Sequence, residues 1–164
     1  MKIVIQRVNS ASIKIDGEPS GSINKGFVVL FGVTESDTRE ITDKMLKKLI
    51  GLRIFDDAEG KTNLALSDVG GEILFVSQFT LYADCKKGYR PSFINAGSPA
   101  HAQEIYDYAV EQIQKTYGFV TQTGAAQSAP APKLVTGSFG AHMEITLVND
   151  GPFTIVLDSA EIVK

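Results

Sequence analysis

The sequence predicts an α+β fold in which a mostly antiparallel sheet is combined with two main helices. Segments with apolar residues at every second position, or apolar throughout, are typical of strands, and they outnumber the segments with helical spacing. With 164 residues, of which 43% are hydrophobic and 21% charged, the chain is long enough for one domain with its own core. We therefore expect residues 1–164 to form a single domain.

Six segments are expected to be strands. In the first, Ile3, Ile5 and Arg7 fall on one face, so an arginine shares a face with two apolar residues. Residues 26–33 are apolar on both faces, which is typical of a central strand. An Asp-Gly turn is expected to join the last two strands as a hairpin, whereas residues 53–71 are expected to be loop-rich. The six segments are residues 2–8, 11–15, 26–33, 72–82, 143–148 and 153–158.

Two segments have the spacing of amphipathic helices. The first covers about 38–50, where Asp37 followed by Glu40 resembles a capping box. The second is expected to begin at Pro99 and to end before Gly118, since proline favours the first helical position and glycine the C-terminal cap. Between this helix and the last strands, residues near 120–135 are rich in Ala, Gly, Ser and Pro, and we expect a flexible surface loop there.

Composition excludes several classes of protein. The single cysteine, Cys85, rules out an intrachain disulfide, and with only two histidines a classical metal hydrolase is not expected. We expect neither a metal nor another cofactor. The N-terminal apolar run is interrupted by Gln6 and Arg7, and no apolar stretch is long enough to span a membrane, which predicts a cytoplasmic protein. Because the net charge is −3, a nucleic-acid partner would have to be held by a local basic patch.

Two segments carry polar or charged residues in a pattern that suits chemistry. Ser77-Gln78-Phe79-Thr80 interrupts an apolar strand, in which Ser77 and Phe79 would share one face and Gln78 and Thr80 the other. No base that could activate Thr80 as a nucleophile is evident nearby, and an ordinary strand leaving the core explains the pattern equally well. The second segment, residues 85–93, contains three cations and an aromatic residue that could grip phosphates and stack on a base. The cations are Lys86, Lys87 and Arg90; a solvated loop is the alternative.

Two further segments are rich in glycine. Gly151-Pro152 directly follows the Asp-Gly turn signal, where a proline would remove a hydrogen-bond donor from the strand. Phe139 and Met143 lie in a stretch with glycines at 137 and 140 and could line a flat apolar slot for a base, although a glycine-rich turn before a strand fits as well.

In combination and in this order, the motifs resemble the D-aminoacyl-tRNA deacylase family, and the resemblance covers nearly the whole chain. Phe153 stands where the family more often has valine. The motifs are Gln6-Arg7-Val8, Ser77-Gln78-Phe79-Thr80, Lys87-Gly88-Tyr89-Arg90-Pro91-Ser92-Phe93, Ser138-Phe139-Gly140 and Asn149-Asp150-Gly151-Pro152-Phe153-Thr154.

The resemblance implies a barrel-like core and an ester hydrolase that acts on D-aminoacyl-tRNA and on some glycyl-tRNA. It implies a homodimer with active sites at the subunit interface, where a cis Gly151-Pro152 step of one subunit enters the partner's pocket and Arg7 helps to hold it. Ser77, Gln78, Phe79 and Thr80 would line the catalytic pocket. Phe139 and Met143 would border the terminal adenosine, and Lys86, Lys87 and Arg90 would contact tRNA phosphates. Neither DNA nor a membrane is an expected partner.

Two alternatives stay open. The chain could be a tRNA- or RNA-binding module without catalysis, or a related proofreading deacylase with an altered chirality preference. Arg7 favours the D-specific enzyme, because a trans Gly-Pro step would not need such a clamp.

Overall fold

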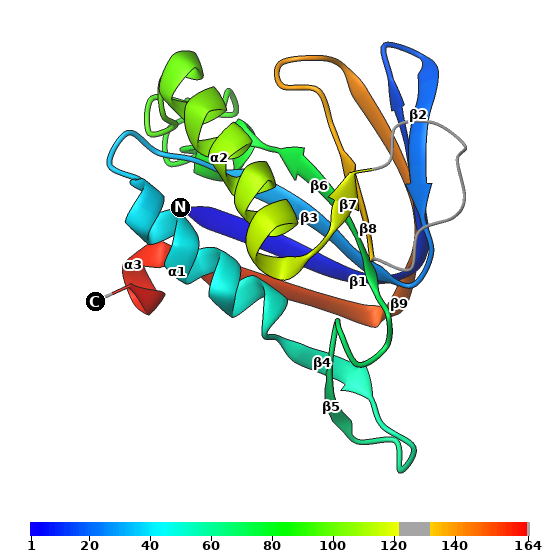
Figure 1. The fold of residues 1–164 in the computed structure, drawn as a ribbon. Helices are drawn as coiled ribbons and strands as arrows, with labels where there is room; N and C mark the ends of the chain where they lie inside the picture. The colour runs from blue at the N-terminus through cyan, green and yellow to red at the C-terminus, as the bar shows by residue number, and fades with distance from the viewer. Residues whose placement is uncertain (122–131, 164) are drawn as a thin grey trace.

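The computed structural model describes residues 1–121 and 132–163, so most of the expected loop near 120–135 lies outside the described residues. A curled mixed sheet is covered on one face by two helices (Figure 1), and the α+β prediction is confirmed. The helices are α1 (Arg39–Ile50), α2 (Pro99–Tyr117) and the short α3 (Ser159–Ile162). The strands are β1 (Lys2–Ile15), β2 (Glu18–Ile23), β3 (Gly26–Gly32), β4 (Arg53–Asp56), β5 (Thr62–Ala65), β6 (Glu72–Ser77), β7 (Val120–Thr121), β8 (Lys133–Thr136) and β9 (Met143–Asp158).

The longest pairing in the sheet joins β1 and β9, which run antiparallel over their whole lengths. Two expectations were wrong here. Residues 2–8 and 11–15 form one strand, and residues 143–148 and 153–158 are the two halves of another, not a hairpin. The physical reason is that the 14-residue β1 offers partners to both halves of β9, with register shifts around Val8 that absorb the Asp150-Gly151 step as a bulge.

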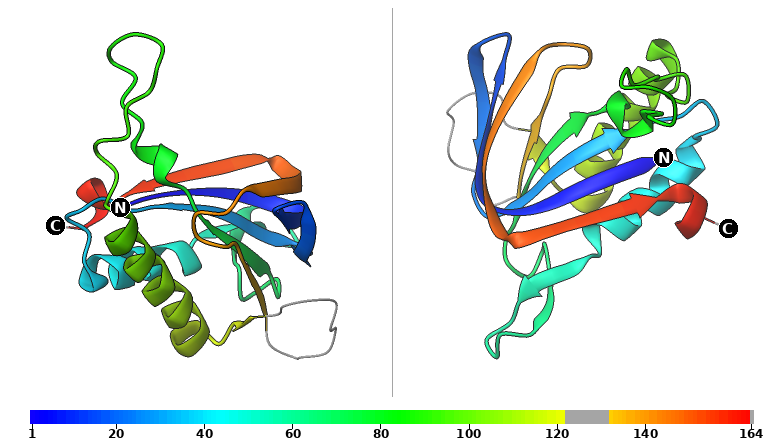
Figure 2. Two further views of the ribbon diagram at one scale, coloured as in Figure 1. Left: turned by 90° about the horizontal axis from the view of Figure 1, so that it is seen from above. Right: turned by 180° about the vertical axis from the view of Figure 1, so that it is seen from behind.

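The central strand β3 pairs antiparallel with β1 and parallel with β6, and β6 in turn pairs parallel with β8. Strand β3 is buried on both faces, which confirms the expectation from its apolar sequence. Strands β4 and β5 form a separate two-stranded hairpin within residues 53–71, which were expected to be loop-rich. Figure 2 shows how the sheet curls so that β2 and the first half of β9 fold over its other face.

Helix α1 begins one residue later than the expected capping box. Its N-cap is Thr38, whose side chain accepts a hydrogen bond from the N–H of Ile41. Asp37 is buried instead and accepts hydrogen bonds from the Met1 amino group and the N–H of Thr34. Helix α2 begins at Pro99 and ends at Tyr117, and Gly118 caps it with a φ of 72°, as expected.

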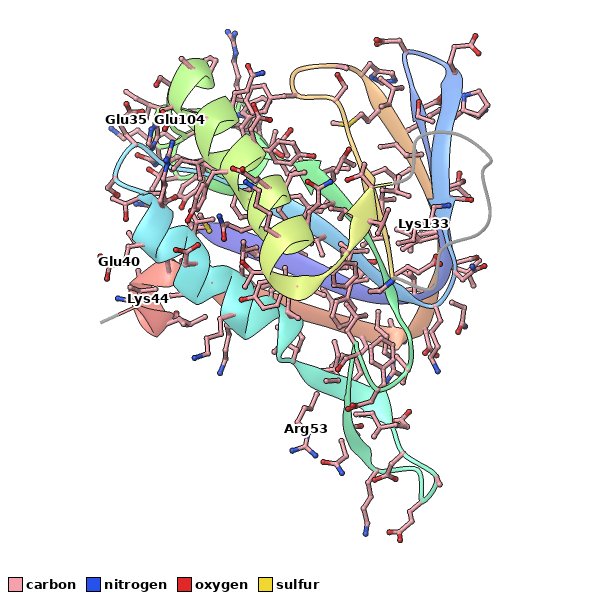
Figure 3. The ribbon with its side chains drawn as sticks, viewed as in Figure 1. Glu35, Glu40, Lys44, Arg53, Glu104 and Lys133 are labelled. Carbon is pink, nitrogen blue, oxygen red and sulfur yellow. The ribbon has the colours of Figure 1, made fainter. Side chains whose placement is uncertain are left out.

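Two apolar clusters hold these layers together. The larger lies between the sheet and the helices, and the smaller fills the inside of the curl. Charged residues occupy the outward faces of the helices, where Glu40 pairs with Lys44 at 2.8 Å and Glu104 of α2 pairs with Arg39 of α1 at 3.0 Å (Figure 3). Within the described residues, the helices are all too short or too polar to cross a membrane.

The expected strand over residues 72–82 ends early, at Ser77. The N–H of Gln78 still donates to the carbonyl of Phe31, but β3 ends at Gly32 and offers no further ladder partner. The chain turns into a 3₁₀ helix, η1 (Phe79–Tyr82), which places Leu81 against Gly32. The expected alternation of faces from Ser77 to Thr80 is therefore wrong.

Candidate active site

A pocket of about 290 Å³ opens where β3 and β6 end, between the first half of α2 and the segment that leads into β9. Because two parallel strands end here, their last residues and the residues that follow converge on one edge of the sheet. Most of its lining is apolar, with a few polar side chains. The lining residues are Phe31, Val33, Val76, Ser77, Gln78, Phe79, Ala102, Tyr106, Phe139, Gly140, Ala141, His142, Met143 and Ile145.

An aromatic cluster forms one side of this pocket. The ring of Tyr106 stacks on Phe75 at 5.4 Å and lies 6.3 Å from the ring of Phe139. The Tyr106 hydroxyl donates a hydrogen bond of 2.9 Å to the Phe75 carbonyl, which also accepts from the N–H of Gly137 at 3.0 Å. Burial raises the pKa of Tyr106 above its ordinary value, so this hydroxyl stays a neutral donor. The carbonyl of Phe75 thus ties α2 and the start of the Phe139 segment to the end of β6.

The residues expected to be catalytic lie at the end of β6. Ser77, Gln78 and Phe79 line the pocket, whereas Thr80 is exposed beside it and accepts a hydrogen bond from the Gln78 side-chain amide. Phe79 and Thr80 are the first residues of η1, so their backbone N–H groups have no acceptor within that helix. The arrangement can therefore offer N–H donors at the rim of the pocket.

Phe139 and Met143 also line the pocket, from the segment that leads into β9. The close approach of Met143 and Val76 to residue 137 requires a glycine there, because a Cβ at that position would lie 2.5 Å from the Met143 sulfur and 3.0 Å from Val76. The same segment brings His142 to the pocket, a residue that no sequence pattern indicated as part of a site. Tyr106 also lines the pocket, and its apolar spacing within α2 is equally typical of a residue that only packs in the core.

Arg7 is buried, and its guanidinium connects two distant segments. It donates to the Ile54 carbonyl at 2.6 Å and to the Asp150 carbonyl at 3.1 Å. The Asp150 carboxylate lies 3.2 Å from the same guanidinium, which also lies 4.8 Å from the centre of the Phe153 ring. Arg7 therefore holds the residues on both sides of the Gly151-Pro152 step, an arrangement that suits a clamp.

Gly151 and Pro152 themselves are exposed and are not among the residues that line the pocket of their own chain. The peptide bond between them is cis. Gly151 has a φ of +135°, and a Cβ there would lie 2.7 Å from the backbone nitrogen of Phe153. Only glycine adopts this backbone conformation readily.

The three expected phosphate contacts lie on a projecting segment between η1 and α2, which we call the arm (residues 84–92). Asp84 and Ser92 pair through both backbone hydrogen bonds, at 2.7 and 2.9 Å, and so close its base. Lys86, Lys87 and Arg90 are exposed on it, together with Tyr89. Figure 2, left, shows this segment extending away from the sheet and helices. Within the described part of the chain, His, Cys, Asp and Glu side chains do not gather in a group of three or more that could hold a metal ion.

Comparison with known proteins gives a consistent result. The family model described as D-Tyr-tRNA(Tyr) deacylase matches residues 4–158. A D-aminoacyl-tRNA deacylase of Thermosipho melanesiensis is 46% identical, with 99% of each chain covered. One of Natranaerobius thermophilus is 45% identical, with 97% of each chain covered.

Two solved structures share the fold. The c-Myc DNA Unwinding Element Binding Protein is 38% identical with a TM-score of 0.83, covering 96% of this chain and 98% of the other. A probable eukaryotic D-amino acid tRNA deacylase is 16% identical with a TM-score of 0.77, covering 95% and 97%.

Proposed function

The chain belongs to the D-Tyr-tRNA(Tyr) deacylase family, and we propose that it hydrolyses the ester bond of D-aminoacyl-tRNA to release the D-amino acid and tRNA. The observation that carries this proposal is the convergence of two separate motifs on one pocket. Ser77, Gln78 and Phe79 meet Phe139 and Met143 there, although about 60 residues separate the two groups. Because charged tRNA is the proposed substrate, we expect the activity in the cytoplasm.

Hydrolysis of an aminoacyl ester does not require a side-chain nucleophile. An aminoacyl ester is already activated, so orientation and stabilisation of the oxyanion can supply most of the rate enhancement. The N–H groups of Phe79 and Thr80 are suited to hold the ester oxygen. The apolar wall of Phe139 and Met143 suits the flat face of the terminal adenine. The 2′-hydroxyl of the terminal ribose then positions or activates the attacking water, in place of a side-chain base.

Chirality is decided at Gly151-Pro152. This step is exposed and held by Arg7, so it is placed to enter the pocket of a second copy of the chain in a homodimer. Backbone carbonyls facing the substrate Cα would leave room for a hydrogen atom and for nothing larger. L-aminoacyl groups are then rejected by steric exclusion, while D-aminoacyl and glycyl groups enter.

A release assay tests this function directly. The substrates are D-tyrosyl-tRNA, L-tyrosyl-tRNA and glycyl-tRNA. Each is mixed with excess protein, and release of the free amino acid is followed in a single turnover. We expect rapid release of D-tyrosine and of glycine and no release of L-tyrosine above the rate in buffer. Faster release of L-tyrosine would instead indicate a deacylase of altered chirality.

The second candidate function is binding of nucleic acid without catalysis. The basic arm and the name of the structural relative that binds DNA favour it. It predicts that none of the three charged tRNAs is hydrolysed while tRNA or single-stranded DNA still binds.

The arm leads to a prediction about binding. Replacing Lys86 and Lys87 together by alanine should weaken tRNA binding to a similar extent for all tRNAs, because phosphate contacts do not depend on sequence. The slope of log Kd against log salt concentration should fall by somewhat less than one unit for each lost contact. Binding titrations at several salt concentrations measure both.

The matched control is the double variant Lys47→Ala and Lys48→Ala, which removes two adjacent exposed lysines from the last turn of α1. It should leave the salt slope unchanged. If the Lys86 and Lys87 variant keeps the slope of the parent protein, the tRNA binds at another surface.

A further inference from the structure

Two large aromatic side chains lie exposed at the rim of the pocket. Phe79 is 57% exposed and Phe93 is 39% exposed. Their centres lie 5.1 Å apart with the planes at 74°, an edge-to-face arrangement that leaves open ring surface toward solvent. Phe93 has no role in the chemistry described above.

This pair connects the pocket with the arm. Phe79 lines the pocket, and Phe93 directly follows the closed base of the arm at Ser92. Beyond that base, the arm carries Lys86, Lys87 and Arg90 around the fully exposed ring of Tyr89. Aromatic surface and positive charge therefore continue outward from the pocket in a protein whose net charge is −3.

We propose that the Phe79–Phe93 pair is a stacking platform for the unpaired nucleotides that precede the terminal adenosine of tRNA. This inference rests on the proposed function only for the identity of the nucleic acid. Single strands are bound by aromatic side chains that stack on bases, next to cations that follow the backbone. A polynucleotide strand that leaves the pocket past Phe79 meets these two features in this order, and its charge complements that of the arm.

The test compares two substitutions at one position. Phe93→Leu keeps apolar packing against Phe79 but removes the aromatic face, whereas Phe93→Trp keeps a stacking surface. Equilibrium binding is measured for an intact uncharged tRNA and for the same tRNA without its single-stranded 3′ end. Tyr108→Leu, which removes an aromatic ring from α2 next to Asp43, is the matched control.

We expect Phe93→Leu to weaken binding of the intact tRNA about tenfold, with no effect on the truncated tRNA. Phe93→Trp and Tyr108→Leu should bind both RNAs like the parent protein. The proposal is overturned if Phe93→Leu weakens both RNAs equally, or if it weakens neither. Because this measurement uses uncharged tRNA, it is independent of whether the protein hydrolyses D-aminoacyl-tRNA.

A kinetic measurement separates the platform from simple support of the pocket. Phe93→Leu should raise the KM for D-aminoacyl-tRNA while the kcat/KM for a D-aminoacyl ester of adenosine alone stays unchanged, since this small substrate has no preceding nucleotides. An equal loss on both substrates would show that Phe93 only supports Phe79, and would also overturn the proposal.

Discussion

Replacing Gly151 by alanine is expected to lower deacylase activity by about a hundredfold or more, because small displacements of the groups that position a substrate have effects of that size. Gly151 has a φ of +135°, which side chains disfavour by about 1–3 kcal/mol. A Cβ would also lie 2.7 Å from the backbone nitrogen of Phe153, so the segment has to move. Single-turnover release from D-aminoacyl-tRNA measures the effect.

Gly17→Ala is the control for the change in stability. Gly17 also has a positive φ, of 86°, but a Cβ there would contact nothing within 4 Å. This variant should lose stability through the backbone conformation alone and keep its activity. A Gly151→Ala protein that is folded and fully active would show that this step takes no part in the reaction.

Much of this site could be predicted from the sequence, because its main signals are local. Arg7 shares a strand face with Ile3 and Ile5, and an arginine on a buried face needs partners. The structure supplies these partners at Ile54 and Asp150. The glycine and proline at 151–152 indicated an unusual backbone at this point of the chain.

The features that the sequence could not predict are those that depend on contacts between segments far apart in the chain. The apolar runs on either side of Asp150-Gly151 have the pattern of a hairpin, and only the length of β1 turns them into one bulged strand. In the same way, the early end of β6 depends on where its neighbour β3 ends. Tyr106 and His142 reach the pocket only because α2 and the segment before β9 are brought together, and no local pattern indicates this.

The second large effect is expected from a change in the substrate. A D-aminoacyl-tRNA whose terminal adenosine lacks the 2′-hydroxyl should be cleaved about 10²–10⁴ times more slowly, the usual contribution of a positioned acid or base. Among the described residues that line the pocket, a serine, a glutamine, a tyrosine and a histidine are the polar side chains, and Tyr106 is held as a buried donor. The rate is measured in a single turnover and divided by the rate in buffer, since the 2′-hydroxyl also affects spontaneous hydrolysis.

Two variants decide whether a side chain does this work instead. Thr80→Ala and His142→Gln remove the candidate nucleophile beside the pocket and the histidine that lines it, and both should keep substantial activity on the normal substrate. Loss of a true covalent nucleophile would cost more than about a thousandfold. If His142→Gln is inactive and the 2′-deoxy substrate is cleaved at the normal rate, His142 is the general base. If Thr80→Ala alone abolishes activity while the fold is intact, the reaction proceeds through an acyl-enzyme at Thr80, and the 2′-hydroxyl has only a binding role.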